Sequence, residues 1–289
     1  MNTVSTSRYL DSLLQGQPPA SPLSWLNELR ANAVDRVGAL SVPTTRDEDW
    51  RFTDISPLTK LSFQPAKHAA QLAPAHIAQW SIAEAAARLV FVDGIYAPEH
   101  SFNRAGITVE NLASGATSQA AAVQAQLGRH ARFERNAFAA LNTAFLHDGA
   151  LIIVPRDTAP AAPVHLLFIA TRKQAASYPR CLVIAESGSA LTVVEDFVAL
   201  QDAAYFTNAV TEIALAGNAK VHHVRVQRDG PEAFHFANCA VSLASASRYR
   251  SVSVALGARI SRFNLNVLLA AEGAECSMDG LALIGGAQL

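Results

Sequence analysis

The sequence is short of charge and of cysteine. Only 16% of its 289 residues are charged, against about 25% in a typical soluble domain. The 23 basic and 24 acidic residues leave a net charge of -1. Binding nucleic acid as a main function needs a surplus of clustered Lys and Arg, so that function class is excluded. The three cysteines, Cys181, Cys239 and Cys276, form no CxxC pair, and their odd number is a poor disulfide framework, so a reducing cytoplasm fits best.

Three further signals are missing. No apolar run approaches the roughly 18 residues that cross a bilayer, and the longest runs, 151–154 and 267–271, have the length of a strand. The segment 1–17 carries no basic stretch followed by an apolar core, which argues against a secretory signal. No GxxxxGK[ST] phosphate loop occurs, so any ATP hydrolysis would come from a partner.

Half of the residues are hydrophobic, and the first part of the chain arranges them as helices. Residues 21–40 begin with Ser21-Pro22, a plausible N-cap and first helical position, and carry apolar residues at spacings of three and four. Thr45 to Glu48 spells a capping box just before Trp50. Residues 77–88 fit either a further helical stretch or a loop that leads into strands.

From residue 89 the pattern becomes that of strands. LVFVDGIYAP (89–98) contains an Asp-Gly turn between two apolar runs and predicts a hairpin. Residues 111–131 are rich in Ala and polar residues, which predicts a surface helix or an excursion from the sheet. Ala150 to Val154 then begins a series of short strands that continues to the last residue.

This series repeats. Small-residue turns centre on Gly188, Gly217, Ser245 and Gly273, at successive spacings of 29, 28 and 28 along the chain. Each turn precedes a strand-like segment, such as VHHVRVQ (221–227), and a second turn falls about halfway through each unit. A period of about 20 to 50 residues with no intervening helix is typical of a β-solenoid. An ordinary β-sandwich, whose strands also recur at intervals of about 8 to about 12 residues, remains the alternative.

We therefore predict a mainly β protein: a parallel β-helix over residues 89–289, preceded by a helical region over residues 1–88. The last unit stops at residue 289 without a polar cap, and a solenoid needs capped ends. We expect the β-helix to be incomplete there, and the residues after about Ala271 to fray or self-associate.

Several stretches carry a family resemblance. RDEDWRFTDISPL (46–58) resembles the N-terminal motif of the SufB/SufD family of iron-sulfur cluster assembly proteins, and the segment 50–53 favours its SufD branch. Further similar stretches, in the same order along the chain, are LVFVDGIY (89–96), LNTAFLHDGALIIVP (141–155), YPRCLVIAESGSALTVVEDFV (178–198), NAVTEIALAGNAKVHHVRVQ (208–227) and the segment 257–288.

The resemblance implies a right-handed parallel β-helix between two helical regions. It also implies a cytoplasmic complex with SufB and the ATPase SufC, on which iron-sulfur clusters are built and passed on. In the family, the parts beyond the end of this sequence pair with SufB, dock SufC and carry the residues implicated in cluster assembly. We therefore assign no catalytic, cofactor-binding or metal-binding residue to this chain.

Thiolates hold iron-sulfur clusters, so the cysteines are the first candidate ligands. Cys181 and Cys239 lie 58 positions apart, which is two periods, so they share a column of the solenoid at a separation of about 9 to 10 Å. That is too far for one compact site. Cys276 falls at a different phase. We interpret all three as buried small hydrophobic residues.

The histidines lack a second ligand at a working spacing. His222 and His223 are adjacent on a strand and face opposite ways, and His235 faces away from both Phe234 and Phe236. We interpret the histidines as surface or lightly packed residues rather than metal ligands.

Acidic and basic residues suggest two further hypotheses. Glu195 and Asp196, with Asp202, raise the alternative of a β-helix carbohydrate-active enzyme, a lyase or hydrolase, although Glu195 and Asp196 face opposite ways on a strand. A strip of arginines on the last coils is interpreted as a solvated solenoid face. Its members are Arg248, Arg250, Arg259 and Arg262.

The predicted function is a scaffold and not an enzyme. A β-helix offers long rigid faces and two ends, and an open end can pair by strand addition. We expect SufB and SufC homologues as partners, with a homodimer through β-helix edges as a further option. No nucleic acid or membrane partner is expected. The iron-sulfur cluster would be assembled by the complex and not bound by this chain.

Overall fold

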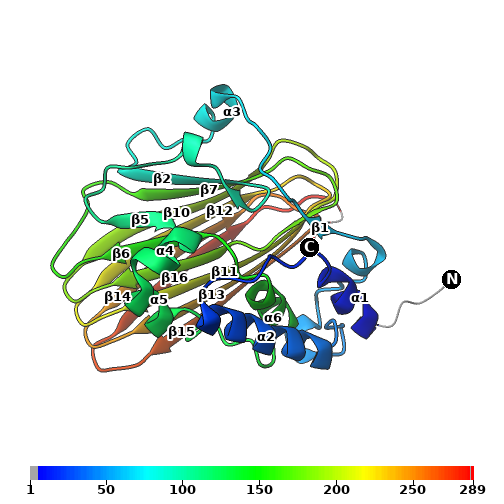
Figure 1. The fold of residues 1–289 in the computed structure, drawn as a ribbon, viewed down its shortest axis with the longest axis horizontal. Helices are drawn as coiled ribbons and strands as arrows, with labels where there is room; N and C mark the ends of the chain where they lie inside the picture. The colour runs from blue at the N-terminus through cyan, green and yellow to red at the C-terminus, as the bar shows by residue number, and fades with distance from the viewer. Residues whose placement is uncertain (1–5, 287) are drawn as a thin grey trace.

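A computed structural model describes residues 6–286 and 288–289 of the chain. Its centre is a β-solenoid of about five turns, in which two mostly parallel sheets face one another and the coils stack in chain order (Figure 1). Most helices from the first half of the chain lie against one side of this stack, whereas the short helix at residues 74–78 packs on the other sheet (Figure 1). The predicted mainly β fold with a small N-terminal helical region is confirmed.

The first sheet contains the strands β1 (Gln64–Pro65), β5 (Thr108–Asn111), β6 (Ala150–Val154), β8 (Ala175–Ser177), β9 (Arg180–Ala185), β11 (Phe206–Leu215), β13 (Phe234–Leu243) and β15 (Ile260–Leu269). The second contains β2 (Ala87–Val92), β3 (Ile95–Tyr96), β4 (Phe102–Asn103), β7 (Val164–Ala170), β10 (Ala190–Ala199), β12 (Lys220–Arg228), β14 (Arg248–Ala255) and β16 (Glu275–Ala282). The α-helices are α1 (Thr6–Leu13), α2 (Ser24–Ala39), α3 (Pro74–Ala78), α4 (Leu112–Ser118), α5 (Ala120–Gln126) and α6 (Ala137–Ala144). The short 3-10 turns of the described residues are η1 (Glu48–Trp50), η2 (Leu58–Lys60) and η3 (Pro98–His100).

The strand register reproduces the sequence period. In the second sheet Ala190 pairs with Lys220, Lys220 with Arg248, and Arg248 with Glu275, so successive partners are offset by 30, 28 and 27 positions. A residue with positive φ lies at each predicted turn or one position after it. These residues are Gly188, Asn218, Ala246 and Gly273. The repeat is therefore a repeat of one coil, and the β-sandwich alternative is wrong.

The lumen between the sheets is filled because alternate residues of each strand point inward. Phe91, Phe168 and Phe197 stack in one column, with ring centroids 5.1 and 4.7 Å apart on successive strands. Val, Leu and Ile side chains from both sheets complete this core. The low charge content of the chain follows from this arrangement, since both sheets bury their inner faces.

The outer face of the first sheet is covered by helices. Phe206, Phe234 and Phe236 point outward from β11 and β13 and are buried beneath α6 and the N-terminal segment. Phe138 of α6 lies 4.5 Å from Phe236, measured between ring centroids. This aromatic layer joins the helical region to the solenoid.

Two predicted helix starts are wrong. Helix α2 begins at Ser24 with Leu23 at its N-cap, because the Asn27 side chain accepts a hydrogen bond from the Ser21 N–H and donates one to the Ser21 carbonyl. The segment 45–48 forms no capping box. The carboxylate of Asp47 instead accepts from the backbone N–H of Thr44, and only the short turn η1 follows.

The remaining local predictions concern one hairpin and two segments outside the solenoid coils. The hairpin is confirmed: β2 and β3 are antiparallel, and Asp93 and Gly94 between them have positive φ. Residues 111–131 contain α4 and α5. Residues 77–88 are mostly loop, because α3 ends at Ala78 and β2 begins at Ala87.

Candidate functional site

The lumen contains charged side chains as well as hydrophobic ones. Strand β12 points His223, Arg225 and Gln227 inward, and all three are at most 1% exposed. His235 is fully buried in the same lumen, and His165 is fully buried on the outer side of β7 beside Asp196. The interpretation of the histidines as surface or lightly packed residues is therefore wrong for three of them, because each has a carboxylate neighbour inside the protein.

One half of this lumen cluster is built on His223. Its Nε2 lies 3.3 Å from Oε2 of Glu195, and its Nδ1 lies 2.9 Å from the Tyr249 hydroxyl. Thr211 donates to the other Glu195 oxygen at 2.6 Å. Burial disfavours the imidazolium, but the Glu195 carboxylate outweighs it and raises the pKa of His223 to about 10. Burial likewise works to raise the pKa of Glu195, but the charge of His223 lowers it overall. At neutral pH this is a buried ion pair.

The other half joins Arg225 to Asp229 through His235. The His235 Nδ1 lies 2.7 Å from the Asp229 carboxylate, and its Nε2 lies 2.6 Å from the Arg225 guanidinium. Because arginine can only donate, Nε2 accepts and His235 is neutral, in line with a pKa that burial lowers. Burial works to raise the pKa of Asp229, but hydrogen bonds from His235, Tyr205 and Gln227 outweigh it and hold it below its usual value. Positive and negative groups are thus matched within the lumen.

The cysteines lie close to this cluster. Cys181 and Cys239 occupy one column, since both pair with Thr211 on the strand between them, which confirms that they are two coils apart. Both are buried, as predicted, whereas Cys276 on β16 is only partly buried. The Cys239 Sγ lies 3.9 Å from the Tyr249 hydroxyl. Over residues 6–286 and 288–289, no group of three or more His, Cys, Asp and Glu side chains is arranged to hold a metal ion.

The carboxylates proposed for carbohydrate chemistry are separated. Glu195 points into the lumen, while Asp196 points to the outer face and pairs with Arg228, which stacks on Trp80. Asp202 lies exposed on a loop. Acid and base catalysis on a sugar needs two carboxyl groups facing one bond, at about 5 to 9.5 Å from each other, and these three do not face one site.

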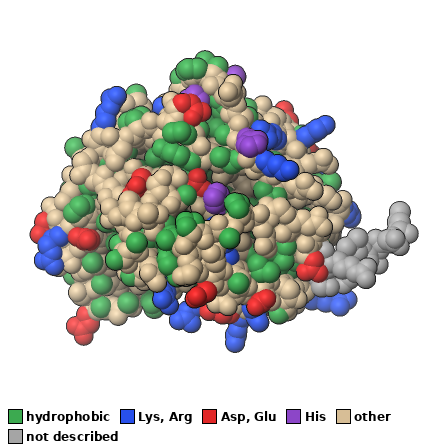
Figure 2. All heavy atoms as spheres, viewed as in Figure 1, with side chains coloured by type: hydrophobic (Ala, Val, Ile, Leu, Met, Phe, Trp, Pro, Cys, Tyr) green, Lys and Arg blue, Asp and Glu red, His purple; other side chains and the backbone are tan. Residues whose placement is uncertain are grey.

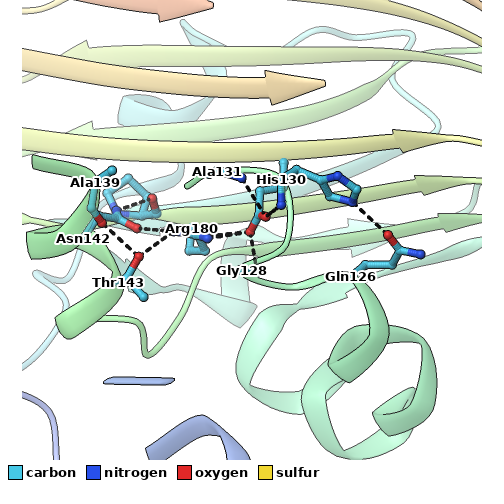
Figure 3. A network of polar contacts seen from close by, with 10 residues as sticks. Gln126, Gly128, His130, Ala131, Ala139, Asn142, Thr143 and Arg180 are labelled. Atoms are coloured by element: carbon cyan, nitrogen blue, oxygen red, sulfur yellow. Dashed lines mark hydrogen bonds and ion pairs between the residues drawn. The ribbon is translucent and has the colours of Figure 1, made fainter. Parts of the chain in front are cut away.

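A second buried network lies outside the lumen, beneath the loop between α5 and α6 (Figure 3). Arg180 of β9 and Glu212 of β11 form a fully buried ion pair, and Arg180 also donates to Asn142 and Thr143 of α6. Burial works to raise the pKa of Glu212, but Arg180 and three backbone N–H donors from residues 128–131 lower it overall. The sequence pattern does not predict this pair. Its only trace in the sequence is that each of the two apolar strands contains one charged residue.

The arginine strip is only partly a solvated face. Arg248 and Arg250 are exposed and pair with Glu275 and Asp279 on β16. Arg262 is different, because its guanidinium stacks on the Trp50 ring at 4.1 Å and burial lowers its pKa. On the face drawn in Figure 2, basic and acidic side chains are scattered and no large patch has one sign.

These features define a solenoid that holds several charged side chains in buried contacts, and comparison with known proteins gives its family. The SufBD protein N-terminal region matches residues 19–166, and the core domain described as SUF system FeS cluster assembly, SufBD core domain, matches residues 168–289. The chain belongs to the SufBD family. The resemblance found in the sequence is confirmed.

Individual relatives agree with this assignment. An iron-sulfur cluster assembly SufBD family protein of Synechocystis is 34% identical over 275 residues, covering 90% of this chain and 60% of the relative. The iron-sulfur cluster assembly protein SufD of Escherichia coli is 29% identical over 248 residues, covering 84% of this chain and 56% of the relative. The chain thus spans somewhat over half the length of these relatives. None of the described helices is long and apolar enough to cross a membrane.

Proposed function

We propose that this chain is a scaffold subunit of the SUF iron-sulfur cluster assembly machinery, working in the cytoplasm with homologues of SufB and of the ATPase SufC. The family membership of both its halves carries this proposal. Its relatives include proteins named as SufD in Escherichia coli and Bacillus subtilis. The cluster is cargo of the assembled complex, so this chain needs no ligand set of its own.

The structure supports a scaffold in preference to an enzyme. The buried charged groups of the lumen contact other lumen side chains and are closed off from solvent, as the His223–Glu195 ion pair and the Arg225–His235 hydrogen bond illustrate. Glu195 and Asp196 face opposite sides of their strand. What the fold presents outward is a set of rigid faces and strand edges, which suit protein partners.

Co-expression with SufB and SufC homologues from the same genome tests the proposal. The tagged chain should retain both through affinity purification and elute with them as one complex, with its mass measured by light scattering. The same experiment without the SufB homologue is the control, because it separates direct contact with SufC from contact through SufB. A chain that elutes alone beside folded SufB and SufC would contradict the proposal.

A further inference from the structure

A groove of about 1280 Å³ runs over the outer face of the first sheet at its last two strands, β13 and β15. Its walls come from residues 40–50 and from residues 130–139, which lead into and form the start of α6. Two parts of the chain that are distant in sequence therefore enclose it. The groove is separate from the lumen cluster, because its floor is the opposite face of the same strands.

The two walls carry opposite charge. Asp47, Glu48 and Asp49 are exposed on the first wall. Arg132 and Arg135 are exposed on the second, which also contains Glu134. Within residues 6–286 and 288–289, neither arginine has an ion-pair partner, and no ion pair joins the walls. The Asp47 carboxylate accepts hydrogen bonds from Thr44, so the charges best placed to meet a ligand are those of Glu48, Asp49 and the two arginines.

The floor offers amide groups. Asn238 and Asn264 are neighbours in register, and the Asn238 oxygen accepts from the side chains of both Asn264 and Asn136, at 3.0 and 3.1 Å. The Asn238 NH₂ group and the Asn264 oxygen have no hydrogen-bond partner in the described part of the chain, and Asn266 lies exposed beside them. A donor and an acceptor on adjacent strands match the N–H and C=O of a polypeptide backbone.

We propose that this groove binds an extended polypeptide segment of a partner protein that carries both acidic and basic residues. Its acidic residues would face Arg132 and Arg135, its basic residues would face the wall that contains Asp47 to Asp49, and its backbone would lie on the asparagine floor. A nucleic acid fits less well, because the acidic wall repels phosphates. This inference does not depend on the proposed function, since it rests only on the charges and amide groups that line this groove.

Fluorescence anisotropy with three labelled ten-residue peptides tests the inference: alternating Glu-Lys, all Glu and all Lys. The alternating peptide should bind saturably and more tightly than either single-sign peptide, and its binding should weaken with salt. In Arg132→Glu/Arg135→Glu the alternating peptide should lose roughly tenfold in affinity and the all-Lys peptide should gain, because both walls of the groove become acidic. Asn266→Ala should weaken the alternating peptide severalfold.

Lys173→Glu is the matched control, because Lys173 is exposed and does not line the groove, and its binding should equal that of the unchanged protein. Thermal unfolding by circular dichroism checks that every variant is folded. The inference is overturned if the alternating peptide fails to bind up to 1 mM (roughly the weak limit of such contacts), if Lys173→Glu matches the double variant, or if a single-stranded DNA of equal length binds more tightly.

Discussion

Arg180 and Glu212 lie on neighbouring strands of the first sheet and face the helices, and neither side chain has any exposed surface. The Glu212 carboxylate also accepts hydrogen bonds from the backbone N–H groups of Gly128, His130 and Ala131, at 2.8, 2.8 and 3.1 Å. The ion pair therefore joins two strands to the loop between α5 and α6 (Figure 3). It serves the packing of the helical layer onto the solenoid.

Glu212→Gln should be strongly destabilising, because it leaves the Arg180 charge buried without a counter-charge. The expected loss in the free energy of unfolding is about 3 to 5 kcal/mol. Asp279→Asn is the matched control, because its pair with Arg250 is exposed and should be worth less than about 1 kcal/mol. Guanidinium unfolding of both variants measures the difference. Equal losses would contradict the structural role given to the buried pair.

Stability should fall on both sides of neutrality, for different reasons. The pKa of His223 is raised to about 10, so the folded protein holds this proton more tightly. Its contribution is complete below the ordinary pKa of 6.5 and is lost as the pH rises through about 10. The pKa values of Glu195 and Glu212 are lowered, so their contribution is present above the ordinary value of 4.5 and is lost as the pH falls.

His223→Gln separates the alkaline effect from other titrations. The variant should be less stable at pH 7, because Glu195 loses its counter-charge, and its stability should change less between pH 7 and 10 than that of the unchanged protein. Denaturant unfolding at several pH values measures this slope. His68→Gln, at an exposed position, should keep the original profile. An unchanged alkaline slope in His223→Gln would show that another group governs it.

Substitution by alanine should change the stability of the protein in opposite directions at two glycines. A Cβ at Gly149 would overlap the Arg180 carbonyl oxygen, which is backbone and cannot move aside. Gly149→Ala should therefore cost at least about 3 kcal/mol. Gly38 lies exposed in α2, and no atom lies within 4 Å of the place that an added methyl group would take, so Gly38→Ala should stabilise the protein by about 0.4 to 1 kcal/mol. Thermal unfolding of the two variants measures both changes in stability. An unchanged stability in Gly149→Ala would contradict the close approach of Gly149 to the Arg180 carbonyl oxygen.

The sequence period predicted the solenoid because each coil uses the same turn and the same alternation of inward and outward residues. Alternation assigns faces, but it does not show whether an outward face is covered. Arg180 and Glu212 point outward and are nevertheless buried, because a loop from a distant part of the sequence closes over them. His223 and Arg225 point inward, where a hydrophobic residue is the usual expectation. The partners of His223 come from the preceding and following coils, whereas Arg225 meets His235 on the opposite sheet of its own coil. The alternation along one strand records neither contact.

The motif at residues 50–53 contains one aromatic residue that packs against the solenoid and one that is exposed to solvent. Trp50 packs on Phe138 and Phe236, with ring centroids 5.6 and 5.7 Å apart, and carries the Arg262 guanidinium on its ring. Phe52, two residues later, is 86% exposed. Trp50→Ala should therefore cost about 2 to 3 kcal/mol, somewhat below the loss for a fully buried tryptophan, because Trp50 is half-buried. Phe52→Ala should change stability by less than about 0.5 kcal/mol.

Denaturant unfolding of the two variants measures this contrast within one short segment. Trp50→Phe is the conservative control, and it should recover about half of the loss, because a smaller ring still contacts Phe138 and Phe236. Amide exchange at residues 262–266 should increase in Trp50→Ala and not in Phe52→Ala, since Arg262 loses its stacking partner only in the first. A loss in Phe52→Ala as large as in Trp50→Ala would mean that the whole segment, and not the Trp50 contact alone, holds the N-terminal region on the solenoid.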